Sequence, residues 1–493
     1  MALFWIRLSL YIFPFLRTVI AASGNCDVAP LSLPWSNVTV SANGVAVARG
    51  LELGIGSPNQ IFSLRPSTTL NNTRLSNVLD CGSEANTSCV GGKGGVYNSS
   101  KSSTCSVSIK DRWNGSAADT ETATGSYVYL NDFIDFQSND SIWGFPLVED
   151  SDLVSGTQSG LPLGQNSSFL AAVTEANVAP SKAWGLWAGD RSLSPIDGAL
   201  TIGGYDPGRV AGNFATFPLG TWTLQQPCPL QVTVISIMYN QPNESFELLS
   251  SENMVACIEP FQDRFTFTPD VVNKFANVTS YDSSYRGLTY PVAQAPDGNM
   301  TITLENNYTT VISNSKFVAL ERGSDQFGHF QITNSSVVET EIVYNAQSDP
   351  STVQPILGGI FLTFNYLVVD YESGHFQLAP AVQGNQHTGS QAVRAICTPT
   401  PTSNPSSSSS PPLSSQNKPR KTGIIVGGTV GGVAGLAIMG VLVLLFRRHR
   451  QQRRVQELRI EPSDRGAQLS PNVLSVTSSE EAAHSSPSEL PLV

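Results

Sequence analysis

The sequence is poor in charged residues, and outside its C-terminal part it is especially poor in clustered positive charge. Charged residues make up 14% of the 493-residue chain, and the formal net charge is −11. No basic run precedes residue 418, so the chain lacks the positive surface that nucleic-acid binding requires. Residues 31–381 contain only two histidines, His329 and His375, and no pair of ligand residues with metal-site spacing. We expect no nucleic acid, no metal and no cofactor.

Charge is absent altogether from residues 423–446, which are almost entirely apolar or small. At about 1.5 Å per residue, a helix of this length spans a bilayer core of roughly 30 Å. We therefore predict one transmembrane helix, over residues 422–446. Five arginines follow within residues 447–454, against three basic residues within 418–421, and this asymmetry predicts a cytoplasmic C terminus. The expected location is the plasma membrane or another membrane of the secretory pathway.

Glycines recur at every fourth position of the predicted span. Gly427, Gly431 and Gly435 would lie on one side of the helix, as small residues do at helix-dimer interfaces. A homodimer is one interpretation of this spacing. The other is that glycine is simply frequent in such helices.

The N terminus predicts entry into the secretory pathway. Arg7 precedes an apolar stretch, residues 8–16, and the small residues 21–23 offer a cleavage site, so residues 1–22 are predicted to be a signal peptide. Every Asn-X-Ser/Thr sequon precedes the predicted span, as expected for a glycosylated ectodomain. The candidate sites are Asn37, Asn71, Asn86, Asn98, Asn114, Asn139, Asn166, Asn243, Asn277, Asn299, Asn307 and Asn334.

All seven cysteines also precede the span, which suits disulfides formed in an oxidising compartment. Their odd number leaves at least one thiol unpaired or bridged to another chain. The near pair Cys81 and Cys89 is the one bridge that we predict.

Two segments of biased composition flank the predicted span. Residues 397–421 are dominated by Ser, Thr and Pro, which cannot bury a core and indicate an extended, O-glycosylated stalk. The tail, residues 447–493, begins with an arginine-rich run suited to anionic lipids and continues as Ser-rich, acidic sequence. We interpret the tail as disordered, and either phosphorylated or passive.

The remaining chain has the pattern of an all-β ectodomain. Short runs rich in Val, Ile, Thr, Phe and Tyr alternate with Gly, Pro, Asn and Asp, for example at 199–204, 231–237 and 366–371. Helical signals are few, and residues 167–176 and 269–276 carry the best of them. Because this length exceeds what one β core usually holds, we expect two lobes, residues 23–216 and 217–396.

Four segments, in order, resemble the pepsin-like aspartic proteases. Residues 50–64 (GLELGIGSPNQIFSL) resemble the opening strand pair of that family, and residues 96–104 (VYNSSKSST) resemble a segment that follows it. Residues 197–206 (DGALTIGGYD) and 355–371 (PILGGIFLTFNYLVVDY) resemble two later elements. The resemblance implies a bilobal all-β fold. With the predicted span, the arrangement is similar to membrane-anchored fungal members of the family.

The resemblance also implies a catalytic site that this sequence lacks. The family uses two Asp-Thr/Ser-Gly loops, one from each lobe, whose carboxylates share one proton and activate a water. Counting from Gln60 puts Ser67 at the first position, without a carboxylate. Counting from Ala256 puts Glu259 at the second position, whereas counting back from Pro269 puts Pro260 there. The family's flap, which covers the cleft, would come from residues 113–116 or 124–127. Trp113 either replaces the flap tyrosine or belongs to the core.

Three functions follow from these observations. The first is a catalytically impaired, membrane-anchored ectodomain whose interlobe cleft binds a peptide or glycan, or serves only as a scaffold. The second is a surface sensor that signals through the tail, similar to fungal cell-wall sensors in architecture only. The third is an active aspartic endopeptidase with an atypical site. Fold alone does not choose among them.

Overall fold

A computed structural model describes most of the predicted ectodomain. The described residues are 26–109, 113–117, 127–136, 138, 140–150, 158–221, 227–249, 252–285, 287–343, 354–384 and 393–397. The predicted signal peptide, span and tail lie outside them, as do the predicted stalk after Cys397, Asn139, and Gly427, Gly431 and Gly435. None of the helices formed by the described residues has the length and apolar character needed to cross a bilayer.

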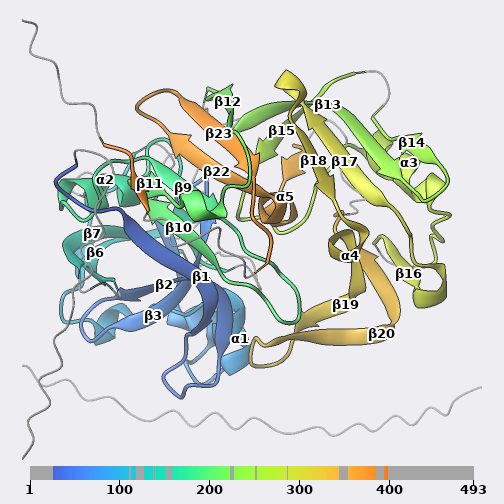
Figure 1. Ribbon diagram of the computed structural model, residues 1–493. Helices are drawn as coiled ribbons and strands as arrows, with labels where there is room; N and C mark the ends of the chain where they lie inside the picture. The colour runs from blue at the N-terminus through green and yellow to red at the C-terminus, as the bar shows by residue number, and fades with distance from the viewer. Residues whose placement is uncertain are drawn as a thin grey trace, which may run out of the picture. The chain divides into compact units, whose positions relative to one another are not determined.

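The fold is mostly β, as the sequence predicts, and its largest sheet has 13 strands. In spatial order this large sheet contains β12 (Ala215–Pro218), β23 (His375–Pro380), β22 (Asn365–Asp370), β9 (Trp184–Trp187), β10 (Gly198–Ile202), β1 (Leu31–Thr39), β2 (Val47–Ile55), β3 (Gln60–Ser67), β8 (Gly160–Pro162), β4 (Thr73–Ser76), β7 (Ser141–Asp150), β6 (Tyr127–Asp135) and β5 (Ser106–Ser108). The strands β22 and β23, from the C-terminal part of the chain, thus pair with strands of the N-terminal part (Figure 1).

Two further sheets are built from the second half of the chain, and a separate two-stranded sheet pairs a strand near residue 204 with one near residue 394. The C-terminal sheet contains β18 (Thr309–Ile312), β17 (Asn299–Leu304), β13 (Gln231–Asn240), β15 (Met254–Ile258) and β21 (Ile356–Leu357), with β14 (Ser245–Glu247) paired to β13. A three-stranded sheet contains β16 (Thr289–Pro291), β20 (Phe330–Thr340) and β19 (Val318–Ser324). The pair is β11 (Gly204–Tyr205) and β24 (Arg394–Ala395).

The helices are short. They are α1 (Thr87–Lys93), α2 (Ser168–Glu175), α3 (Pro269–Val278), α4 (Asn314–Phe317) and α5 (Gly359–Phe364), with 3₁₀ turns at Val78–Cys81, Ser99–Lys101, Pro207–Arg209, Val292–Gln294 and Glu305–Asn307. Both helices predicted from the sequence are confirmed. The Ser167 hydroxyl caps α2 by accepting from the Leu170 amide, and Pro269 occupies the first turn of α3, where its missing N–H costs nothing.

Three disulfides join the described residues: Cys26–Cys397, Cys81–Cys89 and Cys228–Cys257. The predicted Cys81–Cys89 bridge is therefore present, and Cys105 is the unpaired cysteine that the odd count requires. Because Cys397 is bonded to Cys26, the folded part extends one residue past the predicted boundary at 396. This bridge joins the first and the last of the described residues.

Candidate functional site

Ser67 and Glu259, the two positions that the sequence resemblance singles out, lie in two similar strand-and-loop units. In the first, β3 ends at Ser67 beside its parallel partner β8, and α2 follows β8. In the second, β15 ends directly before Glu259 beside its parallel partner β21, and α5 follows β21. Ser67 and Glu259 therefore occupy corresponding positions, each at the carboxyl end of a parallel strand pair.

The two units meet through the Glu259 side chain. Its Oε2 atom accepts hydrogen bonds from the Thr68 hydroxyl at 2.8 Å, and from the amides of Thr68 and Thr69 at 3.1 Å each. Its Oε1 atom accepts from the Phe261 amide at 2.9 Å. Of the two sequence registers, the one that sets Glu259 opposite Ser67 agrees with this contact. Pro260, the alternative, is buried beside it.

Ser67 itself does not bond to Glu259. Its hydroxyl lies 3.0 Å from the Thr69 hydroxyl and accepts from the Thr69 amide at 3.3 Å. Ser67, Thr68 and Glu259 are 2%, 0% and 4% exposed, so the contact between the two loops is closed to solvent. Among the described residues, the donors to Glu259 are backbone amides and one hydroxyl, and none is a second carboxyl group.

Burial governs the ionisation of this site. It raises the pKa of Glu259, and the hydrogen bonds from Phe261, Thr68 and Thr69 offset the rise only in part. Burial also raises the pKa of Tyr371, and the nearby charge of Glu259 adds to that effect. The site is thus one carboxyl group enclosed by protein donors, which is suited to holding two loops together.

A cavity of about 840 Å³ opens beside these loops, along the large sheet and the β19–β20 hairpin. Its wall contains a carboxylate shared by two arginines: Asp263 pairs with both Arg65 and Arg191. Partial burial favours the neutral form of Asp263, but the two guanidinium groups outweigh it and hold the pKa of Asp263 below its usual range. One anion between two cations leaves local positive charge on this wall.

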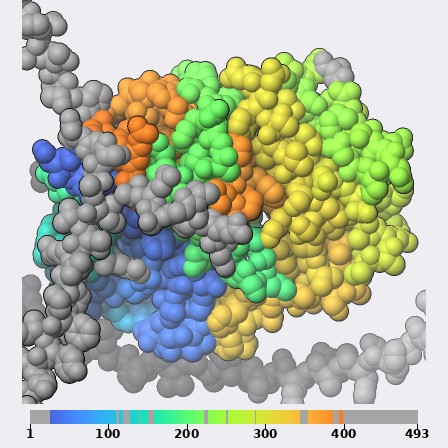
Figure 2. All heavy atoms as spheres, viewed as in Figure 1, coloured from blue at the N-terminus to red at the C-terminus, as the bar shows by residue number. Residues whose placement is uncertain are grey.

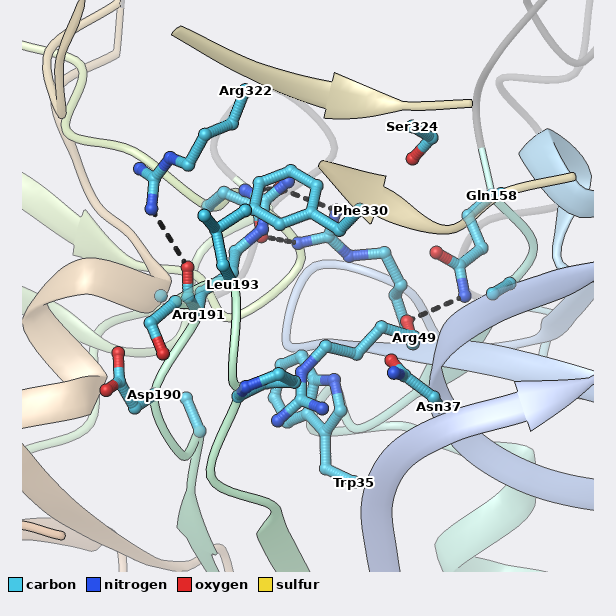
Figure 3. A pocket seen from close by; sticks show the side chains of 18 of the residues that line it. Trp35, Asn37, Arg49, Gln158, Asp190, Arg191, Leu193, Arg322, Ser324 and Phe330 are labelled. Carbon is cyan, nitrogen blue, oxygen red and sulfur yellow. Dashed lines mark hydrogen bonds and ion pairs between the residues drawn. The ribbon is translucent and has the colours of Figure 1, made fainter. Parts of the chain in front are cut away.

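Aromatic rings lie against Arg65 and Arg191, and against a third arginine of the cavity wall, Arg322. The guanidinium carbons of Arg191 and Arg322 lie 5.0 and 5.5 Å from the centre of the Phe330 ring, within cation–π range. Arg322 also donates to the Arg191 carbonyl oxygen at 3.1 Å, as the dashed line in Figure 3 shows. Arg65 stands over Phe261 at 5.4 Å. The wall therefore combines fixed charge with ring surfaces.

The tip of the β19–β20 hairpin closes one side of the cavity. The Val47 amide of β2 donates to the Phe327 carbonyl oxygen at 2.7 Å. Gly328 has φ +89°, and a β carbon there would lie 1.8 Å from the Val47 carbonyl oxygen, so this approach requires glycine. In Figure 2 the gold atoms of the hairpin adjoin the blue atoms of the N-terminal strands. The hairpin thus bridges the two halves of the chain.

The other predicted residues have varied surroundings. Trp113 is buried, packs against Tyr129 with tilted rings whose centres are 4.9 Å apart, and donates its indole N–H to the Leu130 carbonyl oxygen, as a core residue does. Asn71 is 0% exposed and its side-chain oxygen accepts from the Asn166 amide at 3.0 Å, so packing encloses this glycosylation candidate. Asn98 is half-buried. The exposed sequons are Asn37, Asn86, Asn114, Asn166, Asn243, Asn277, Asn299, Asn307 and Asn334.

Two comparisons with known proteins found no match. A scan against models of protein families gave no match, and a search of curated proteins gave none either. Among the described residues, no group of three or more His, Cys, Asp or Glu side chains could hold a metal ion.

Sequence reasoning missed the Arg65–Asp263–Arg191 cluster. One signal was available: Arg65 is the one charged residue of the strand Gln60–Ser67, two positions before Ser67. Such a residue usually needs a buried partner. The partner is 198 positions away, and only the fold brings it close.

Proposed function

We propose that the chain is a membrane-anchored, glycosylated ectodomain with a bilobal pepsin-like fold that no longer hydrolyses peptides. In this proposal the large sheet and the C-terminal sheet belong to the two lobes, and the cavity between the halves of the chain binds a peptide or a glycan. The repeated strand-and-loop units around Ser67 and Glu259 support the fold assignment. The charge-free residues 423–446 and the one-sided sequons support the anchor and the surface location.

The environment of Glu259 is the observation that supports the proposed loss of proteolytic activity. Aspartic proteolysis needs two carboxyl groups that share a proton and activate a water between them. Ser67 supplies only a hydroxyl, and both oxygens of Glu259 already accept from Thr68, Thr69 and Phe261. Glu259 is also 4% exposed, so among the described residues the site offers neither a second carboxyl group nor an exposed carboxyl oxygen to take a proton from water.

A peptide-library assay tests this proposal directly. The purified full-length protein, incubated with the library at pH 3 to 6, should give no cleavage that pepstatin inhibits. Glu259→Gln serves as the matched variant, because any cleavage by a contaminating protease would be equal in both samples. Pepstatin-sensitive turnover that disappears in Glu259→Gln would overturn the proposal.

A separate experiment tests the anchor. The full chain should stay with the membrane fraction through alkaline carbonate extraction, whereas a chain ending at residue 421 should be released as soluble glycoprotein. Release of the full chain by carbonate would contradict a transmembrane span.

A further inference from the structure

Asn37 lies on the wall of the cavity. Successive side chains of a strand point to opposite faces, so Trp35 and Asn37 share one face of β1. Both line the cavity, and Figure 3 shows both projecting from β1 into the same space. Trp35 is 5% exposed, whereas Asn37 is exposed. A glycosylation sequon therefore opens into the cavity.

The surroundings of Asn37 suit a sugar. Arg49 lies directly opposite Asn37 in the β1–β2 pair, and its guanidinium is held by Asp197 at 3.0 Å and by the Ile196 carbonyl oxygen at 2.9 Å. Gln158 donates to the Arg49 carbonyl oxygen at 3.1 Å. Polar side chains fixed in this way can bond to sugar hydroxyl groups.

The atom that would carry the sugar is available. The Asn37 side chain makes no hydrogen bond with the described residues, whereas the amide nitrogens of Asn86 and Asn98 already donate to the Cys81 carbonyl oxygen at 3.3 Å and to Glu84 at 3.1 Å. In N-glycosylation the amide nitrogen attacks the first carbon of an oligosaccharide carried on a lipid pyrophosphate. An N–C bond forms, the C–O bond to the pyrophosphate breaks, and the nitrogen loses a proton. At Asn37 this costs no internal hydrogen bond.

We infer that the N-linked glycan of Asn37 occupies the cavity and controls access to it. A cavity of about 840 Å³ is within the range of roughly 300–1,000 Å³ that holds compact ligands, so the first sugars of the glycan fit inside. The glycan is then an intramolecular ligand that competes with any external one. This inference rests on the proposed secretory ectodomain and specifies how its cavity is regulated.

Native deglycosylation of the full chain, expressed in a secretory host, tests the inference. Asn243 is the reference site, because it is exposed in the turn between β13 and β14 and lines none of the described cavities. Site-resolved mass spectrometry should show both sites occupied. An endoglycosidase should release the Asn37 glycan at least about tenfold more slowly than the Asn243 glycan, because cleavage requires the glycan to leave the cavity. After denaturation the two rates should be equal.

A pair of variants provides the second measurement. Thr39→Ala removes the sequon and keeps Asn37, whereas Thr39→Ser changes the same exposed side chain and keeps the sequon. Hydrogen exchange at the Val47 amide, beside the hairpin tip, should be faster in Thr39→Ala than in Thr39→Ser. If Asn37 carried no glycan while Asn243 did, or if both glycans were released at equal rates from the native protein, this inference would be overturned. The proposed ectodomain would not be affected. Absence of a glycan from both Asn37 and Asn243 would instead contradict the secretory ectodomain.

Discussion

The Thr68 hydroxyl lies 2.8 Å from Oε2 of Glu259, although 191 positions separate the two residues. The same hydroxyl approaches the Ile258 carbonyl oxygen at 3.2 Å. Thr68 follows a strand of the large sheet and Glu259 follows a strand of the C-terminal sheet. The contact therefore joins the two sheets beside Ser67 and Glu259, the two positions that the sequence resemblance assigns to a catalytic pair, and it gives Glu259 a structural role.

Glu259→Gln should destabilise the fold. The glutamine amide presents two N–H donors to a site whose neighbours, the amides of Thr68, Thr69 and Phe261, are also donors. A buried donor left without an acceptor costs about 1–3 kcal/mol, and we expect a loss of that size in the free energy of unfolding. Denaturant titration at neutral pH measures it. Glu244→Gln, at an exposed site, is the control and should change stability by less than about 0.5 kcal/mol. Equal midpoints for the two variants would remove the structural role.

The same pair of proteins should differ in their response to pH. Burial raises the pKa of Glu259 in the folded state, whereas a glutamate in the unfolded chain titrates near pH 4.3, so the folded state keeps the proton at higher pH. The resulting stabilisation is full below about pH 4.3 and is lost as the pH rises through the folded pKa. Glu259→Gln cannot titrate there, so its deficit should shrink as the pH rises. A deficit that widens from acid to neutral pH would mean that the folded pKa is lowered.

Asp263→Asn should destabilise the fold, because it leaves the positive charge on the cavity wall unbalanced. It removes the anion shared by Arg65 and Arg191 and leaves two guanidinium groups close together. Breaking a fully buried pair costs about 3–5 kcal/mol; Asp263 is partly exposed, so we expect roughly 1–3 kcal/mol. The lowered pKa of Asp263 means that its contribution is present above about pH 3.9 and is lost on acidification.

Asp197→Asn is the control for this substitution. It breaks the Arg49–Asp197 pair, in which the Asp197 side chain is 59% exposed, and should cost less than about 1 kcal/mol. Denaturation of both variants at neutral pH, and of Asp263→Asn again at pH 3, measures the difference. If Asp263→Asn remained as costly at pH 3 as at neutral pH, the ion pairs would not account for its effect.

Local patterns in the sequence predicted much of the fold, and non-local pairing explains what they missed. Alternation and β-branched runs located strands such as β13 and β22, and turn and capping residues located α2 and α3. No local pattern could place β22 and β23 in a sheet with the N-terminal strands, because their partners are far away in the sequence. The Cys26–Cys397 bridge was missed for the same reason, at a separation of 371 residues.

At the candidate site, counting from a motif found Glu259 but not what surrounds it. The position followed from spacing within one strand, whereas its donors come from the loop after Ser67. The cavity wall depends on Arg65, in β3, and Asp263, in the loop after β15, which meet only in the folded chain. A sequon pattern also cannot distinguish an exposed asparagine such as Asn37 from Asn71, which packing buries.

Two of the three disulfides, Cys26–Cys397 and Cys81–Cys89, should differ in their contribution to stability. A cross-link removes conformational entropy from the unfolded chain in proportion to the logarithm of the loop that it closes. By that relation the Cys26–Cys397 bridge, at a separation of 371 residues, contributes about 5–6 kcal/mol. The Cys81–Cys89 bridge, at a separation of 8, contributes about 2–3 kcal/mol. Denaturant midpoints should therefore fall further for the double variant Cys26→Ser/Cys397→Ser than for Cys81→Ser/Cys89→Ser. The reverse order would show that local packing around α1, not loop closure, determines the effect.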